Sequence, residues 1–169
     1  MASIHPRRAL PIAALLALSL ALVAPAIATA DDKSFADTAI AEAQKLGKAE
    51  KATGKAVSKV RTHSRKAITT ARKKIAGVRK QAARMTEAVG AQEPSTETGA
   101  AAKTKLLKLL KTERSAYGTL DDALAQLRKG NVSTANKLAK RANKRLKDVA
   151  KDATELGRTL AQLSAGAPA

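Results

Sequence analysis

Apolar and small side chains recur at every third or fourth residue along most of the chain, which is the spacing of one face of an α-helix. Residues 34–89 contain no Pro, and the repeat in this stretch includes Val57, Val60, Ala67, Ala71, Ile75, Val78, Ala82, Met85 and Val89. A heptad-like repeat of leucines follows at Leu106, Leu110, Leu120, Leu124 and Leu127. The pattern predicts long amphipathic helices, which are stable in water only when their apolar faces pack together.

Bulky core residues are scarce in this chain. Its 169 residues include one Phe, one Tyr, no Trp and no Cys. Strands of β-sandwiches and doubly wound α/β domains favour aromatic and β-branched residues, so the composition disfavours both folds. Without Cys, neither disulfide bonds nor thiol chemistry can contribute. The sequence therefore predicts an all-α protein that is held together by packing alone.

The first thirty residues have the features of a secretory signal peptide. Arg7 and Arg8 form a basic head, residues 9–23 are apolar, and residues 28–30 place small side chains before Asp31. An uncleaved membrane anchor is the alternative, but the apolar run is shorter than the roughly 20 residues that a membrane span needs. Twin-arginine export is disfavoured because Pro11 interrupts that signature. We expect residues 1–30 to be cleaved off, and the mature protein to be secreted or to lie in the periplasm or cell envelope of a bacterium, with no transmembrane span.

Glycines and a proline divide the mature chain into helices. A kink is expected near residues 47–54, because Gly47 and Gly54 each cost about 1 kcal/mol relative to Ala inside a helix. Pro94 and Gly130 are expected to end the helices that precede them. The predicted helices cover residues 34–90, 96–129 and 133–164, within a single domain at 31–165 that is followed by a short tail at 166–169.

The predicted helices have similar lengths, so each can cover the others from end to end. The short connection at residues 130–132 makes the last two helices antiparallel. We expect an antiparallel bundle of three long helices with coiled-coil-like seams and an additional N-terminal helical segment. That segment either folds back at the glycines as a short fourth helix or extends the first helix. Because Ala seams bury little apolar surface, we expect modest stability or a self-association that completes the core.

Few residues of this sequence could carry chemistry. His63 is the only His after residue 30, and no acidic orienting partner lies beside it at helical spacing, so a solvated helix residue is the better interpretation. The scattered carboxylates match no recognised zinc or calcium spacing. The sequence predicts no catalytic residue, no cofactor and no metal site, and hence no enzyme. Glu113 is an unusual polar residue in the leucine seam, either buried for a specific purpose or at the edge of the seam.

Positive charge is the strongest functional signal. The chain has 32 basic and 14 acidic residues, and residues 1–30 hold two of the basic ones and none of the acidic ones, so the mature chain carries a net charge of +16. Basic residues concentrate at 44–84, where Glu50 is the only acid, and at 137–147, outside the apolar seams. We predict that both segments attract polyanions by releasing the counterions held on them. The predicted polyanion-binding residues are Lys45, Lys48, Lys51, Lys55, Lys59, Arg61, Arg65, Lys66, Arg72, Lys73, Lys74, Arg79, Lys80, Arg84, Lys137, Lys140, Arg141, Lys144, Arg145 and Lys147.

Several anionic partners fit this charge. Nucleic acid, a sulfated or phosphate-bearing cell-wall polymer and anionic lipid head groups are all candidates. Sequence-specific reading of bases is disfavoured, because Phe35 and Tyr117 are the only aromatic residues available for stacking. Residues 103–111 combine leucines with lysines as interfacial helices do, although the continuing leucine seam favours a core position. The alternative function is a structural or interaction module that forms a homo-oligomer or recruits a helical partner protein, with charge serving only solubility.

Overall fold

The computed structural model describes residues 30–62 and 64–166, and these residues contain helices and no strands. The predicted all-α class is confirmed. The predicted signal peptide lies outside the described residues except for Ala30, and so does the tail beyond Gly166. In chain order the helices are α1 (Ala30–Ser58), the short 3₁₀ helix η1 (Lys59–Thr62), α2 (Arg65–Gly90), α3 (Glu97–Arg128) and α4 (Val132–Ser164).

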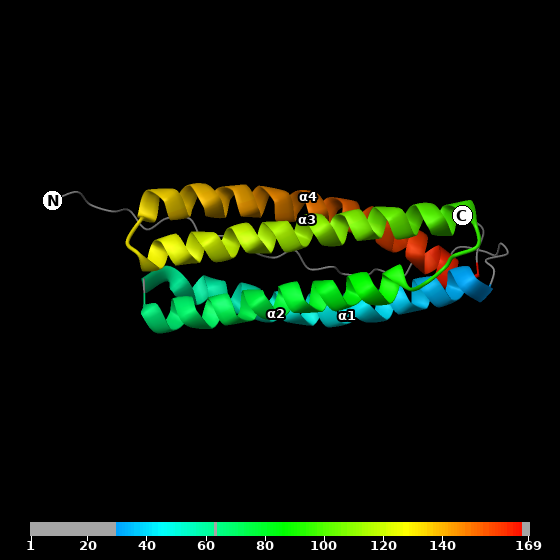
Figure 1. Ribbon diagram of the computed structural model, residues 1–169, viewed down its shortest axis with the longest axis horizontal. Helices are drawn as coiled ribbons and strands as arrows, with labels where there is room; N and C mark the ends of the chain where they lie inside the picture. The colour runs from blue at the N-terminus through cyan, green and yellow to red at the C-terminus, as the bar shows by residue number, and fades with distance from the viewer. Residues whose placement is uncertain (1–29, 63, 167–169) are drawn as a thin grey trace.

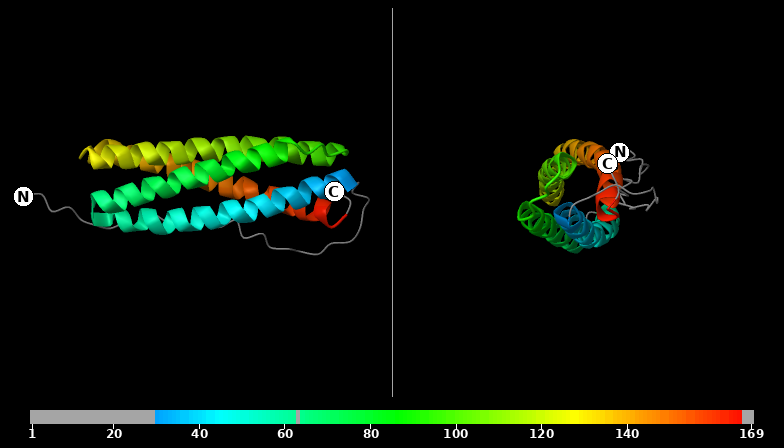
Figure 2. Two further views of the ribbon diagram at one scale, coloured as in Figure 1. Left: turned by 60° about the horizontal axis from the view of Figure 1, so that its bottom comes forward. Right: turned by 90° about the vertical axis from the view of Figure 1, so that its right-hand side faces the viewer.

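The four long helices form a bundle in which consecutive helices run in opposite directions (Figure 1). Viewed from one end, they surround a common core, with α1 packed against α2, α2 against α3, α3 against α4 and α4 against α1 (Figure 2). The turn between α1 and α2 lies at the same end of the bundle as the turn between α3 and α4 (Figure 1). No helix within residues 30–62 and 64–166 has both the length and the hydropathy needed to cross a membrane.

The core is built from the residues that recur at helical spacing. Small residues such as Ala71 and Ala82 alternate along α2 with Ile75 and Val78, and all four are fully buried. The two aromatic side chains of the described region, Phe35 and Tyr117, are also buried. Each helix thus contributes one continuous apolar stripe, whose burial is the main source of stability.

The first interruption of the helices lies at residues 59–64, and the kink expected near residues 47–54 is absent. Helix α1 runs without interruption through Gly47 and Gly54, and the chain turns back at residues 59–64. The helical cost of two glycines is smaller than the gain from keeping Phe35 and Leu46 on one straight face, because burying one such side chain contributes about 1.5–3 kcal/mol. The expected arrangement of three long helices with a kinked N-terminal segment is therefore replaced by four helices of comparable length.

The turn at residues 59–64, which the sequence did not predict, contains neither Gly nor Pro. Helix α1 tightens into η1, and Ser64 then begins α2 by accepting a hydrogen bond from the backbone N–H of Ala67 at 3.5 Å. Ser is a preferred residue at this position because its hydroxyl satisfies a helix N–H that has no partner within the helix. This cap is the local signal that favours a turn here.

A buried carboxylate ties the start of α1 to the loop between α2 and α3. The backbone N–H groups of Ser95 and Thr96 donate to Asp32 Oδ1 at 2.8 and 3.2 Å, and the Thr96 hydroxyl donates to Asp32 Oδ2. Thr96 in turn caps α3 by accepting from the N–H of Gly99 at 3.0 Å. A Cβ atom at position 99 would lie 2.6 Å from Asp32 Oδ1 and 2.7 Å from Pro94 Cβ, so only Gly fits there. These contacts fix the end of the bundle opposite the two turns.

Candidate functional site

Contacts between neighbouring helices show which residues lie at the same level along the bundle. Near its middle, Arg145 of α4 donates to the Ser115 hydroxyl of α3 at 3.3 Å. Slightly further from the two turns, Gln81 of α2 donates to Glu42 of α1 at 2.8 Å. These levels divide the bundle into two parts of similar size.

We call the part nearer the two turns the basic half and the other part the mixed half. The basic half comprises residues 44–80 and 114–147, and the mixed half comprises residues 30–43, 81–113 and 148–166. The basic half contains 22 basic and 3 acidic residues, whereas the mixed half contains 8 basic and 11 acidic residues. The fold therefore gathers the positive charge of two distant segments at one end of the molecule.

All but one of the predicted polyanion-binding residues belong to the basic half; the exception is Arg84 in α2. His63 and the side chain of Arg61 lie outside the described part of the structure. Every other predicted residue is exposed except Arg72, which is half-buried. These positions are thus accessible to a large ligand, and the two predicted segments lie on one part of the surface.

The positive side chains of the basic half have few acidic partners. One of its three acids, Glu50, is buried, and Asp121 is engaged by Arg72. Of the predicted binding residues whose side chains are described, only Lys45 and Arg72 form ion pairs, with Glu42 and Asp121. Asp122 is the one exposed acid that remains free of such a contact, so most of the charge in this half is not neutralised within the protein.

Arg72 has a structural role that the sequence did not reveal. Its Nε and Nη2 atoms donate to the two carboxylate oxygens of Asp121 at 2.8 and 2.9 Å, which joins α2 to α3. The hydrogen bond to Asp121 raises the pKa of the Arg72 guanidinium above its ordinary value, and the charge of Asp121 adds to this. Paired in this fork geometry, Arg72 is the member of the predicted set least available to an external anion.

The exposed cations form stripes on three of the four helices. On α1, Lys45, Lys48, Lys51 and Lys55 follow one another at steps of three and four residues, opposite the buried face. On α2, three exposed lysines are spaced by seven residues, at positions 66, 73 and 80. On α4, the outward stripe contains Lys137, Lys140, Arg141, Lys144 and Lys147. Helix α3 carries both Asp121 and Asp122 in this half, so the cationic surface extends over α1, α2 and α4.

A cluster of ionisable groups lies inside the bundle, close to the boundary between the halves. Glu50 of α1 is 9% exposed and Glu113 of α3 is 3% exposed. The two carboxyl groups are close enough to hydrogen-bond, and the Tyr117 hydroxyl donates to Glu50 Oε1 at 3.3 Å. Glu50 Oε2 and Glu113 Oε1 are buried without a hydrogen-bond partner. The structure thus resolves the two interpretations of Glu113, which is a core residue facing a second carboxyl group.

Burial keeps one proton on the carboxyl pair at neutral pH. The pKa of Glu113 is raised to about 9, mainly by burial and in addition by the charge of Glu50 and a hydrogen bond with it. Burial also raises the pKa of Glu50, against hydrogen bonds from Glu113 and Tyr117 that lower it. The pKa of Tyr117 is likewise raised, mainly by burial. At neutral pH the pair therefore retains a shared proton, as expected when two carboxyl groups meet away from water.

Sequence reasoning missed Glu50 because it stands as the single acid in a long basic segment. Its spacing does give a signal: Leu46, Glu50, Thr53 and Val57 lie at steps of three and four residues and share one buried face. The partner, Glu113, is 63 positions away in the chain and belongs to another helix. No group of three or more His, Cys, Asp or Glu side chains that could hold a metal ion occurs within the part of the chain that the structure describes.

Comparison with models of known protein families, with curated protein sequences and with solved structures found no match to this chain. The fold and the surface themselves therefore define the class. It is an all-α bundle with one strongly cationic half and a buried carboxyl pair.

Proposed function

We propose that this protein is an exported, non-enzymatic binder of anionic polymers that acts through its basic half and does not read sequence. The observation that supports the proposal is the imbalance of 22 basic against 3 acidic residues in that half. If charge served only solubility, a surface with interspersed positive and negative side chains, like that of the mixed half, would be equally effective.

The physical basis of such binding is the release of counterions. A polymer with closely spaced phosphates or sulfates holds a layer of condensed cations, and each protein cation that replaces one frees it into solution. The lysine stripes on α1, α2 and α4 are exposed and largely unpaired, so little internal contact must be broken before they engage a polymer. Affinity should then depend steeply on salt.

Base-specific recognition has no support among the described side chains. Phe35 and Tyr117 are 0% and 2% exposed, which leaves no aromatic platform on which an unpaired base could stack. Contacts through phosphate charge alone position a ligand without reading it. The proposal is therefore limited to charge-driven binding.

The alternative function, recruitment of a helical partner or self-association through apolar seams, has less support. The seams already face one another inside the bundle, and Val132 is the only large apolar side chain that is exposed among residues 30–62 and 64–166. A partner helix needs an apolar face to cover. We retain this function as the outcome that remains if the binding experiment fails.

The test is a titration of the purified protein with duplex DNA and with heparin at several salt concentrations. We expect log Kd for duplex DNA to depend linearly on log salt, with a slope of about 0.9 for each phosphate neutralised. No binding at low salt would overturn the proposal. Anionic vesicles offered in the same series distinguish a lipid surface from a soluble polymer, and binding to vesicles alone would also overturn it.

A pair of matched variants tests which half carries the contacts. Lys66→Glu, Lys73→Glu and Lys80→Glu together reverse the outward stripe of α2. Lys108→Glu, Lys111→Glu and Lys151→Glu change the net charge by the same amount at exposed positions of the mixed half. We expect the first triple variant to weaken DNA binding at least tenfold and to reduce the salt slope by about 2.7, and the second to have a smaller effect on both. Equal losses would show that net charge alone, rather than the basic half, determines binding.

A further inference from the structure

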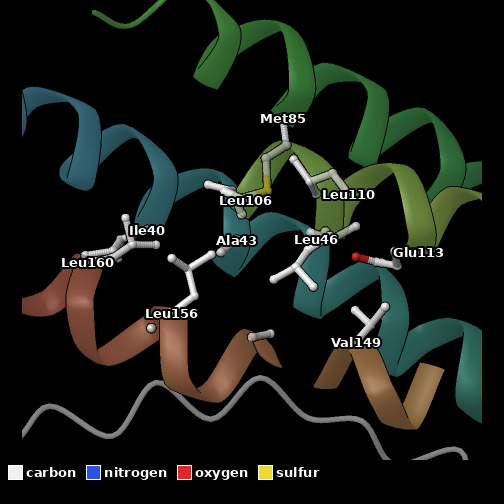
Figure 3. A pocket seen from close by; sticks show the side chains of 13 residues that line it. Ile40, Ala43, Leu46, Met85, Leu106, Leu110, Glu113, Val149, Leu156 and Leu160 are labelled. Carbon is white, nitrogen blue, oxygen red and sulfur yellow. The ribbon is translucent and has the colours of Figure 1, made fainter. Parts of the chain in front are cut away.

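The interior cavity of the bundle is small. It lies between α1, α3 and α4 and extends from Ile40 and Leu160 to Glu113 (Figure 3). Its volume is about 40 Å³, whereas one buried water molecule needs about 10–15 Å³. The cavity therefore has the size of a few water molecules. A larger ligand is better accommodated by the outer surface, where the exposed cations lie.

The order of the helices around the core determines where each cationic stripe points. Helix α1 packs against both α2 and α4, and α3 packs against the same two helices (Figure 2). Helices α2 and α4 therefore occupy opposite corners of the bundle, and α1 occupies a corner between them. Because each stripe faces away from the core, the stripes of α2 and α4 point in opposite directions.

Exposed lysines connect the stripes of α1 and α2. Glu42 of α1 accepts a hydrogen bond from Gln81 of α2, and this contact identifies the sides by which the two helices face each other. Lys45 lies three residues after Glu42, and Lys74 lies seven residues before Gln81, so both lysines lie on these sides of their helices. The two stripes thus form one cationic surface across the junction of α1 and α2.

The stripe of α4 extends toward α1 in the same way. Arg145 contacts Ser115 and so identifies the side of α4 that faces α3. Lys147 lies two residues later, which places it about 200° around the helix, on the side that faces α1. Cations therefore run from α2 over α1 to α4, halfway around the bundle. We call this surface the cationic band, and it comprises Lys45, Lys48, Lys51, Lys55, Lys66, Lys73, Lys74, Lys80, Lys140, Lys144 and Lys147.

The positive charge is not spread evenly around the bundle. Helix α3, at the fourth corner, carries Asp121 and Asp122, so its surface in the basic half has both signs of charge. Residues 44–80 hold 13 basic residues, and residues 132–147 hold six. The side formed by α1 and α2 is thus more strongly charged than the side formed by α4.

A stiff ligand cannot follow the cationic band. With axes about 8–10 Å apart and side chains that reach about 5 Å from each axis, four helices form a cylinder with a radius of about 12 Å. Duplex DNA has a persistence length of about 500 Å, so on this scale it is a straight rod. A duplex therefore binds to the more strongly charged side, over α1 and α2, and leaves the α4 lysines free. A flat lipid surface likewise contacts only one side.

We propose that the ligand of this protein is a flexible single-chain polyanion that passes over α2, α1 and α4 and bends around the bundle. The cationic band belongs to the proposed polymer-binding surface, so this inference rests on the proposed function and names the class of polymer. Each anionic group that reaches the α4 lysines releases further counterions, whereas a duplex on α1 and α2 gains none from them. The protein thus prefers a flexible chain to a stiff one of equal charge.

The first experiment compares two ligands that carry the same number of phosphates. The unaltered protein is titrated at several salt concentrations with an oligothymidylate of about 40 nucleotides and with a duplex of about 20 base pairs. Dividing the slope of log Kd against log salt by about 0.7 for the single strand and about 0.9 for the duplex gives the number of phosphates neutralised. We expect about three more phosphates to be neutralised on the single strand, one for each α4 lysine of the cationic band.

The outcomes separate this inference from the proposed function. If both ligands bind and the protein neutralises equal numbers of phosphates on them, the inference is overturned and the proposed function stands. If neither ligand binds at low salt, both are overturned.

A variant of α4 tests the path of the chain directly. Lys140→Glu, Lys144→Glu and Lys147→Glu together reverse the part of the cationic band that lies on α4, and all three positions are exposed. We expect this triple variant to bind the oligothymidylate at least tenfold more weakly, with a salt slope reduced by about 2.1, which is about 0.7 for each of three phosphates. Duplex binding should change no more than it does in the triple variant of the mixed half, which alters the net charge by the same amount.

Circular dichroism of each variant verifies that the helices are retained. Equal losses for the oligothymidylate and the duplex would overturn the inference, because the duplex would then contact α4 as well. Oligothymidylate binding that survives the α4 substitutions unchanged would also overturn it, because the chain would then not reach α4. In both cases the proposed function would stand, since polymer binding itself persists.

Discussion

The two halves of this bundle share the same helices and the same kind of core, yet they differ sharply in how charge is balanced. In the mixed half, basic and acidic residues are nearly equal in number, and the buried Asp32 is fully engaged by the loop before α3. In the basic half, most cations face water without a partner, and Glu50 is hidden inside. The fold thus tolerates a large local excess of charge where the charges point outward, whereas each acid that it buries either accepts hydrogen bonds from the protein or faces a second carboxyl group.

The largest expected effect concerns the buried carboxyl pair at the boundary of the halves. Glu113 has a pKa near 9 in the folded protein and about 4.5 in the unfolded chain, so the folded state holds the extra proton between these values. Stability should therefore fall as pH rises from about 5 to 9, by about 1 kcal/mol per pH unit where the slope is steepest. Urea unfolding midpoints measured across this range give the test, and Glu113→Gln should flatten the dependence and raise stability at pH 8.

An exposed glutamate supplies the control for this prediction. Glu87→Gln, on the surface of α2, removes one carboxyl group without touching the core. Its pH profile should follow that of the unaltered protein. If Glu113→Gln also leaves the profile unchanged, then the pair is not the source of the pH dependence, and the inferred protonation is wrong.

The periodicity of the sequence was sufficient to predict the helical class, because apolar spacing is local information. The position of the first turn was not predictable in the same way. Gly47 and Gly54 carry a known helical cost, whereas the compensating burial of Phe35 and Leu46 depends on helices that are distant in the chain. The turn at residues 59–64 offered only the Ser64 cap as a local signal.

For the candidate surface too, the sequence predicted what depends on neighbouring residues and not what depends on how distant segments pack. The sequence identified the individual cations, since charge and exposure follow from composition and helix position. It did not show that residues 44–80 fold back on themselves beside the first half of α4, because that depends on the turn at 59–64. Glu50 was missed for a related reason. Its contacts with Glu113 and Tyr117 form only when α1 packs across the core from α3, and the sequence does not show this arrangement.

A smaller effect is expected from the hydrogen bonds that join Asp32 to the loop between α2 and α3 in the mixed half. Asp32→Ala removes the acceptor for two backbone N–H groups and the Thr96 hydroxyl, and should lower the free energy of unfolding by about 2–3 kcal/mol, as for other hydrogen bonds to a buried charge. Hydrogen exchange should quicken in the first turns of α1 and in residues 91–96. The neighbouring exposed Asp31→Ala serves as the control and should change stability by less than about 0.5 kcal/mol. Exchange that quickens equally around the turn at residues 59–64 would contradict a local role for the hydrogen bonds of Asp32.

The smallest effects should distinguish the halves by sign. Lys73 of α2 lies in a region of mutual repulsion, so Lys73→Glu should stabilise the protein by a few tenths of a kcal/mol at low salt. Lys151 of α4 has Asp148 three residues before it and Glu155 four residues after it, so Lys151→Glu should destabilise by a similar amount. Thermal unfolding at about 0.01 M and 0.15 M salt provides the measurement, because the screening length falls from about 30 to 8 Å over this range. Both differences should shrink at the higher salt concentration. A change of the same sign in both variants would mean that local repulsion in the basic half does not limit stability, and that its cations are already screened by ions bound to the surface.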